Sequence, residues 1–226
     1  ATGRYPPGMG ALSDRPVMLV HGVLTNGMEM TLLRRRLRRQ GFAPRQFSYH
    51  SRHLTVAENA CALEDALADW RDQAVVDFVA YSLGGLVLAH FFAQQAWPVP
   101  GRVVLLGVPL RGSEVAAELA RRRFGRWLLG QSLVDGLLGG TPAWPRQRET
   151  LMIAGRLPYG LGYVATLGRL RGPSDGVVRV AETDDPRIIY RQVLPVTHSS
   201  LLISSRVAWV TGQFLREGTV VPDSAA

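Results

Sequence analysis

Ser82 stands at a point in the chain where a serine side chain could act as a nucleophile. It lies in Ala80-Tyr81-Ser82-Leu83-Gly84-Gly85, between the largely apolar run 75–79 and a longer apolar stretch. A serine on a sharp strand-to-helix turn projects from the top of a sheet, and the residues two before and two after it must be small. Ala80 and Gly84 meet that condition, although alanine replaces the more usual glycine. The alternative role for this serine is an ordinary helix N-cap.

His198 and Asp175 could complete the chemistry that Ser82 begins. A nucleophilic serine needs a base, and the base needs a carboxylate to orient it. His198 follows the last predicted strand in a loop, which suits a base better than a core residue. Asp175 lies in the turn 172–178, and the order Ser, Asp, His is the one that accompanies such a serine turn. Glu182, Asp184 and Asp185 remain alternatives for the acid.

Acyl transfer also needs hydrogen-bond donors for the oxygen that becomes negatively charged. The backbone N–H of Leu83 is one candidate, because it follows the nucleophile at the start of a predicted helix. The backbone N–H of Val23 is the second, in the loop 20–27, where Gly22 permits a tight turn. His21 is expected to hold that loop rather than to act as an acid or base. The same structural role is expected of the remaining histidines, which are His50, His53 and His90.

Five motifs together resemble the α/β-hydrolase superfamily, and within it the small bacterial lipases and esterases. They are His21-Gly22-Val23, Ala80 to Gly85, Leu105-Leu106-Gly107-Val108-Pro109 with Arg111-Gly112-Ser113, Ser174-Asp175-Gly176-Val177-Val178, and Thr197-His198-Ser199-Ser200. The resemblance implies an α/β fold with a mostly parallel sheet of about six strands, without the two antiparallel strands that open larger members. It also implies ester hydrolysis through an acyl-enzyme on Ser82, with no cofactor and no metal.

The elements that must position these residues alternate between strand-like and helix-like patterns. Short apolar runs predict strands over 16–20, 42–49, 75–81, 102–108, 151–154 and 188–196. Apolar residues at helical spacing predict helices over 28–40, 55–70, 83–95 and 200–216. Repeated βα units of this kind favour a parallel sheet with helices on both faces. We expect one domain over residues 1–226.

The segment 109–148, after the predicted strand 102–108, is a candidate cap over the acyl pocket. It is rich in leucine, yet it also carries Arg121, Arg122, Arg123 and Arg126, which cannot all be buried. An amphipathic cap would place its leucines over the pocket and its arginines toward water. Leu24, Leu133 and Leu137 are the candidates for substrate contact. Two extra helices packed against the sheet are the alternative.

Composition narrows the remaining classes of protein. The chain has 226 residues, 46% hydrophobic and 19% charged, which excludes a disordered or fibrous protein. No apolar run approaches the ~20 residues of a membrane span. Cys61 is the single cysteine, so a disulfide framework is excluded, and five scattered histidines make a zinc site improbable.

The excess of basic residues indicates which binding partners the protein could have. The net charge is +8, and arginine supplies all 26 basic residues. Solvated helix faces explain this better than nucleic-acid binding does, and weak association with anionic lipid or polymer surfaces is the further expectation. We expect an ester or lipid substrate and no nucleic acid, and the sequence leaves the oligomeric state open. No charged-then-apolar leader opens the sequence, which slightly favours a cytoplasmic location, with export left open.

The leading hypothesis is therefore a serine carboxylesterase or lipase. An acyltransferase or lipid deacylase of the same fold is the alternative, because its catalytic residues would be identical. A non-catalytic basic surface-binding protein is the third hypothesis. Polyester activity is compatible with the sequence but not required by it.

Overall fold

A single six-stranded sheet forms the centre of the molecule. The computed structural model describes residues 15–95, 97–159 and 170–220. All pairings between neighbouring strands are parallel, in the order β2-β1-β3-β4-β5-β6. The strands are β1 Arg15–Val20, β2 Phe42–Phe47, β3 Asp77–Tyr81, β4 Val103–Leu106, β5 Thr150–Gly155 and β6 Tyr190–Leu194. The predicted α/β class with about six strands is confirmed.

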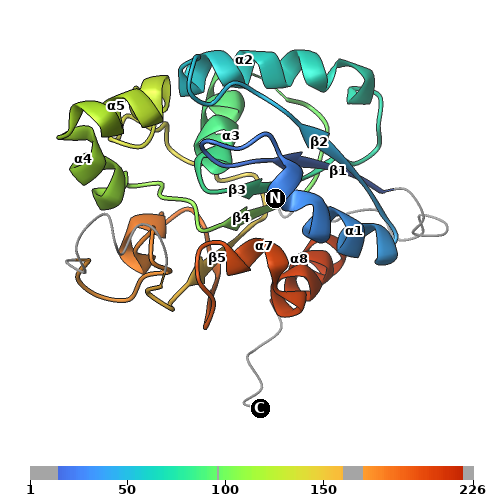
Figure 1. Cartoon of the computed structure of the whole chain (residues 1–226). Helices are drawn as coiled ribbons and strands as arrows, with labels where there is room; N and C mark the ends of the chain where they lie inside the picture. Colours follow the sequence, from blue (N-terminus) through green and yellow to red (C-terminus); the bar gives the residue numbers. More distant parts are fainter. Residues whose placement is uncertain (1–14, 96, 160–169, 221–226) are drawn as a thin grey trace.

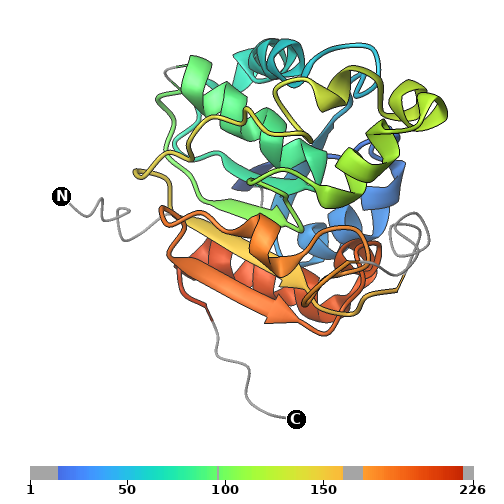
Figure 2. The same ribbon diagram turned by 90° about the vertical axis from the view of Figure 1, so that its left-hand side faces the viewer.

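Helices cover both faces of the sheet (Figures 1 and 2). One face carries α2 Val56–Ala66 and α3 Leu83–Gln94, and the other carries α1 Thr31–Arg39, α7 Ser200–Ile203 and α8 Ser205–Glu217. Helices α4 Glu114–Ala120 and α5 Arg123–Leu129 lie at the margin, followed by the short helix η3 Gly130–Leu133. The other short helices are η1 Met28–Met30, η2 Ala68–Trp70 and η4 Val180–Thr183. No helix in the described part of the chain is both long enough and apolar enough to span a membrane.

The sheet has an apolar core on each face, which explains why the sequence of an inner strand such as β1 is continuously apolar. Along β1, Met18 and Val20 join the core beneath α2 and α3, whereas Val17 and Leu19 join the core beneath α1 and α8. Successive side chains on a strand point to opposite faces, so a strand covered on both sides must be apolar throughout. The sheet is thereby fixed from both sides, with the carboxyl ends of all six strands at one edge.

Two predicted helices are interrupted. The helix expected over 55–70 ends at Ala66 and continues as the separate turn η2. The helix expected over 200–216 breaks at Ser204, whose side chain accepts a hydrogen bond from the Val207 N–H at 3.2 Å and so caps α8. Helical spacing alone does not reveal such breaks, because the apolar stripe passes through them.

The segment 109–148 contains the helices α4 and α5 and the short helix η3. Its apolar residues Ala116, Leu129, Leu137 and Trp144 are buried in the core beneath α2 and α3. The arginines of the range 121–126 are exposed. Packing against the core therefore accounts for part of this segment, and its role as a cap stays a prediction.

A buried ion pair links the start of β1 to the start of β3. The Arg15 Nε lies 2.6 Å from Asp77 Oδ2, and the Arg15 Nη2 donates to Asp77 Oδ1 at 2.8 Å. The backbone N–H of Arg102 also donates to Oδ1, at 2.8 Å. The Asp77 side chain is fully buried, so its charge depends on these partners.

We expect Arg15→Met to lower the free energy of unfolding by about 3 kcal/mol, because it leaves a buried carboxylate unpaired. Urea unfolding at neutral pH measures the loss. Arg15→Met/Asp77→Asn should recover much of it, since the asparagine oxygen still accepts from Arg102. Arg121→Met, which breaks the exposed pair with Glu118, is the control and should cost less than about 1 kcal/mol. An equal small loss in both single variants would contradict the prediction.

Candidate active site

Ser82 occupies a strained turn between β3 and α3. Its φ is 51° and its ψ is −122°, a backbone conformation that residues other than glycine rarely adopt. Its N–H donates to the Leu106 carbonyl of β4 at 2.9 Å, and its carbonyl accepts from the Gly85 N–H at 3.1 Å. Strain of this size persists only where the surroundings hold it, and it is concentrated at functional sites. The N-cap alternative is not supported, because the Ser82 side chain makes no capping hydrogen bond.

Small residues bring α3 and the loop after β1 against each other. A Cβ on Gly84 would lie 2.4 Å from the Val20 carbonyl oxygen and 2.5 Å from that of His21. A Cβ on Gly22 would lie 3.3 Å from the Ser82 Cβ. The first turn of α3 therefore touches the end of β1, which places the loop that carries Val23 beside Ser82.

Asp175 and His198 form a buried hydrogen-bonded pair. The His198 Nδ1 lies 2.6 Å from Asp175 Oδ2, and the His198 backbone N–H donates to the Asp175 carbonyl at 2.8 Å. The second carboxylate oxygen, Oδ1, accepts from the backbone N–H groups of Val177 at 2.9 Å and Val178 at 2.7 Å. A carboxylate at Nδ1 fixes the tautomer that leaves Nε2 as an acceptor. This is the arrangement that a general base requires.

The imidazole of His198 packs against the end of the strand that carries Ser82. Its ring centroid lies 4.8 Å from that of Tyr81, the residue before Ser82. A Cβ on Gly107, directly after β4, would lie 3.1 Å from both His198 Cε1 and Asp175 Oδ2. Burial, followed by the nearby Asp175 charge, raises the pKa of Tyr81, so its hydroxyl stays neutral beside the pair. Gly107 was part of a sequence motif, but its close packing against His198 and Asp175 was not predicted.

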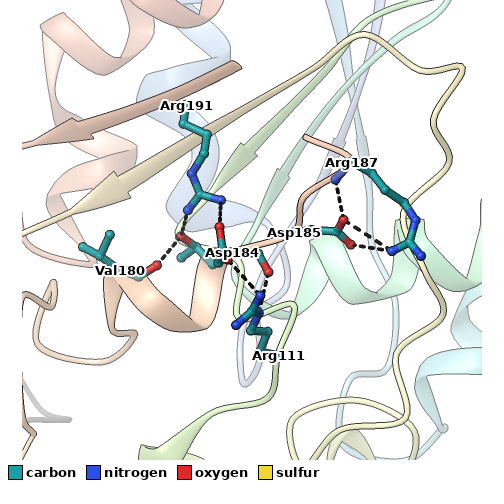
Figure 3. Close-up of polar contacts among 7 residues, drawn as sticks. Arg111, Val180, Asp184, Asp185, Arg187 and Arg191 are labelled. Carbon is teal, nitrogen blue, oxygen red and sulfur yellow. Dashed lines mark hydrogen bonds and ion pairs between the residues drawn. The ribbon is translucent and has the colours of Figure 1, made fainter. Parts of the chain in front are cut away.

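Asp184 and Asp185, two of the alternative acids, are engaged elsewhere (Figure 3). Asp184 lies between two arginines, 2.8 Å from Arg111 and 2.6 Å from Arg191. Asp185 accepts from the backbone N–H of Arg187 at 2.8 Å and pairs with its guanidinium at 3.4 Å. These contacts join η4 and β6 to the segment after β4.

Glu182, the third alternative, is hydrogen-bonded to the start of α4 and to the backbone just before η4. Its Oε1 accepts from the Glu114 N–H and its Oε2 from the Arg179 N–H, both at 2.8 Å. In the part of the chain that the structure describes, Asp175 is the carboxylate that hydrogen-bonds to His198.

The backbone N–H groups of Val23 and Leu83 are available as donors. Leu83 is the first residue of α3, and Val23 follows the glycine that packs against Ser82. Neither N–H donates to another residue within the described ranges. Two unpaired amides beside Ser82 are what a developing oxyanion needs, and their use for that purpose stays a prediction.

Solved structures that share this architecture include a lipase and a carboxyl esterase. The chain superimposes on a Bacillus licheniformis lipase in its mature form with a TM-score of 0.70, at 18% identity over 97% of this chain and 96% of the other. It superimposes on a metagenomic carboxyl esterase with a TM-score of 0.67, at 16% identity over 96% and 80%. The protein has the α/β-hydrolase fold. No protein-family model and no curated protein matches the sequence.

The fold also occurs inside a larger enzyme. A phospholipase from Legionella pneumophila matches with a TM-score of 0.58 at 20% identity, over 75% of this chain and 44% of that one. At these identities the comparisons establish the α/β-hydrolase fold, and the chemistry of this chain must be argued from its own residues.

His21 holds the loop after β1 of this α/β-hydrolase fold. Its Nδ1 donates to the Gly22 carbonyl at 2.8 Å, its Nε2 accepts from the Tyr49 N–H at 3.2 Å, and its ring stacks on Tyr49 at 4.1 Å. Burial lowers the pKa of His21, which favours the neutral ring that this pattern needs. These contacts fit the structural role expected of it.

Ser51 is a residue that the sequence did not single out. It is buried, and its Oγ accepts from the backbone N–H of Leu24 at 3.1 Å. Leu24 has a φ of 62°, so this bond holds a strained residue directly after Val23. Leu24 itself is 47% exposed, as a residue at a pocket mouth can be. Nothing in the local pattern signals Ser51, because its partner lies 27 positions away.

We expect Ser51→Ala to lower kcat for ester hydrolysis about tenfold with KM nearly unchanged, because a donor aimed at the oxyanion acts mainly in the transition state. Steady-state kinetics on a soluble ester measure both constants, and Ser51→Thr, which keeps the hydroxyl, should restore part of kcat. Ser205→Ala is the control, since that serine is exposed at the start of α8, away from the loop 20–27. An unchanged kcat in Ser51→Ala would show that Ser51 does not position this loop.

Leu133 is the last residue of η3, and Leu137 lies four residues further along the chain. Leu133 is half-buried against the core beneath α2 and α3, and Leu137 is buried within it. Leu137 also lines an open cavity of about 450 Å³ between α4 and η4, whose lining includes neither Ser82 nor His198. A role of these two leucines in acyl binding stays a prediction.

Proposed function

We propose that this protein is a serine carboxylesterase or lipase that hydrolyses carboxylic esters. The observation that carries the proposal is the buried hydrogen bond of 2.6 Å between His198 and Asp175, beside a serine in a strained strand-to-helix turn. A structural serine needs neither the strain nor an oriented imidazole next to it. The three residues follow three different strands, β3, β5 and β6, whose carboxyl ends lie at the same edge of the parallel sheet.

The first half of the reaction acylates Ser82. Its Oγ attacks the ester carbonyl carbon while His198 Nε2 takes the hydroxyl proton. The carbonyl oxygen becomes an oxyanion and accepts hydrogen bonds from the N–H groups of Val23 and Leu83. The tetrahedral intermediate then collapses, the bond to the alcohol oxygen breaks, and His198 gives its proton to the departing alcohol.

The second half releases the acid. Water enters the place of the alcohol, and His198 takes its proton as the water oxygen attacks the acyl carbon. A second tetrahedral intermediate collapses to the free acid and the Ser82 hydroxyl, which regains its proton from His198. Throughout, the Asp175 carboxylate stabilises the imidazolium that forms twice in each turnover.

The substrate class rests on the ester chemistry that such a site performs. The solved structures that share the fold include a lipase, a carboxyl esterase and a phospholipase, which agrees with an ester or lipid substrate. An acyltransferase would use the same residues, with an alcohol in place of water in the second half.

The test is a series of p-nitrophenyl esters from acetate to palmitate, with and without added glycerol. Hydrolysis with release of free acid supports the proposal, and the acyl length at which kcat/KM peaks measures the depth of the acyl pocket. Formation of glycerol esters as the main product would favour the acyltransferase. No turnover of any ester, together with no labelling of the protein by a fluorophosphonate probe, would contradict both.

A further inference from the structure

Helix α5 displays two aromatic side chains to solvent on one face. Phe124 is 70% exposed and Trp127 is 57% exposed, and their rings lie 5.7 Å apart in a stacked arrangement. Residues three apart share a helix face, so the pair forms one apolar spot. Large exposed aromatics gathered together mark interaction sites more often than single exposed ones do.

The orientation of α5 is fixed by its opposite side. Leu129 is buried in the core, and a Cβ on Gly125 would lie 2.0 Å from the Leu119 carbonyl oxygen of α4. The two helices are therefore in direct backbone contact at the margin of the molecule (Figures 1 and 2). Phe124 and Trp127 cannot turn inward without breaking this packing.

Arginines surround the aromatic pair. Arg121, Arg122, Arg123 and Arg126 are exposed, and the Arg52 guanidinium lies over the Trp127 ring at 4.2 Å. Arg121 pairs with Glu118 at 3.2 Å. No carboxylate within the described ranges pairs with Arg52, Arg122, Arg123 or Arg126. The surface thus carries five arginines, and only Arg121 is paired with a carboxylate in the described part of the chain.

We propose that this α5 surface, made of Phe124, Trp127 and the five arginines around them, docks the protein on an anionic lipid bilayer. Arginine at the head-group level and aromatic rings at the acyl boundary are the chemistry that a bilayer interface takes up. A nucleic-acid duplex or an acidic protein would use the charges but leave the aromatic pair uncovered, whereas a single strand could stack its bases on the two rings. A bilayer supplies anionic head groups and apolar acyl chains together. We therefore favour a lipid bilayer because the surface combines exposed arginines with an exposed aromatic pair.

The docking surface is adjacent to the loop that carries the oxyanion candidate. Arg52, which covers Trp127, follows Ser51, and Ser51 holds Leu24 next to Val23. A bilayer bound at α5 would therefore lie near the mouth of the site. This use of the surface rests on the proposed function, whereas the binding itself does not.

Vesicle flotation with the full-length Ser82→Ala protein tests binding without consumption of lipid. Vesicles of phosphatidylcholine alone are compared with vesicles that contain phosphatidylserine, at low and at physiological salt. We expect binding to the anionic vesicles that weakens with salt. Arg122→Ala/Arg123→Ala should weaken it about tenfold or more, and Phe124→Ser/Trp127→Ser should weaken it about tenfold at constant charge.

Matched controls lie on other faces of the molecule. Arg38→Ala/Arg39→Ala removes two exposed arginines from α1, and Trp209→Ala removes a partly exposed tryptophan that also has an arginine over its ring. Both should bind as the parent protein does, and thermal unfolding shows whether every variant folds.

Three results would overturn the proposal. They are absence of binding to anionic vesicles, equal weakening in the control variants, and retention on heparin with no effect of the aromatic substitutions. Concentration-dependent dimers that disappear in Phe124→Ser/Trp127→Ser, without vesicle binding, would assign the surface to a second copy of the chain instead. If the wild-type protein hydrolysed no ester, the vesicle-binding result would still stand. The proposed activity and the proposed docking surface can therefore fail separately.

Discussion

Replacing Ser82 by alanine is expected to abolish ester hydrolysis, with a loss of roughly five orders of magnitude in kcat. The reason is that the acyl-enzyme cannot form without the Oγ, and the residual rate comes only from binding and oxyanion stabilisation. The fold should survive, because alanine removes one oxygen from a side chain that caps nothing. Initial rates on a p-nitrophenyl ester and the unfolding midpoint measure the two effects.

A fluorophosphonate probe provides the second readout for Ser82. Mass spectrometry of the labelled wild-type protein should locate the probe on the peptide that contains Ser82, and labelling should disappear in Ser82→Ala. Ser205→Ala is the control, since that serine is exposed at the start of α8. Undiminished activity or labelling in Ser82→Ala would falsify the assignment of the nucleophile.

Loss of either member of the buried pair is expected to cost nearly as much. His198→Ala should lower kcat by several orders of magnitude, and adding it to Ser82→Ala should cost little more, because the residues act as a unit. Asp175→Asn should cost about four orders of magnitude, since an amide favours the wrong imidazole tautomer. Rates at several pH values separate these effects from a shift in protonation.

Asp184→Asn is the matched control for Asp175→Asn. It removes a charge that Arg111 and Arg191 compensate, at a carboxylate that does not contact His198. Its rate should stay within a few-fold of that of the wild type. If Asp175→Asn kept nearly full activity while the change at Asp184 or Glu182 did not, the acid would be one of those residues.

The sequence predicted the features of the fold that local patterns encode. Apolar runs located inner strands of the sheet, including the carboxyl end of β3, and the small residues around Ser82 predicted the turn at that point. The edge strands β2 and β6 were also predicted, although both carry polar residues. The turn after the predicted strand 151–154 favoured Asp175 over the later acids, and its carboxylate is hydrogen-bonded to His198, while its catalytic role stays a prediction. Each of these inferences needed only neighbouring residues or chain order.

Contacts between distant segments escaped that reasoning. Arg15 and Asp77 pair across 62 positions, and Ser51 reaches Leu24 across 27. Leu137 is buried in the core, and its predicted contact with substrate stays a prediction, because a leucine-rich pattern does not distinguish a pocket wall from core packing. Such pairs depend on how elements dock, which no window of sequence contains.

The way in which the Asp175 loop is tied also bears on how this protein could change. The carboxylate is oriented by the main-chain amides of Val177 and Val178, and the main chain of His198 donates to the Asp175 carbonyl. Peptide groups are the same whatever side chains follow them. Any substitution of the half-buried Val177 other than proline therefore keeps the N–H that orients the Asp175 carboxylate. Side chains in this loop can therefore change while the backbone contacts that orient Asp175 stay the same.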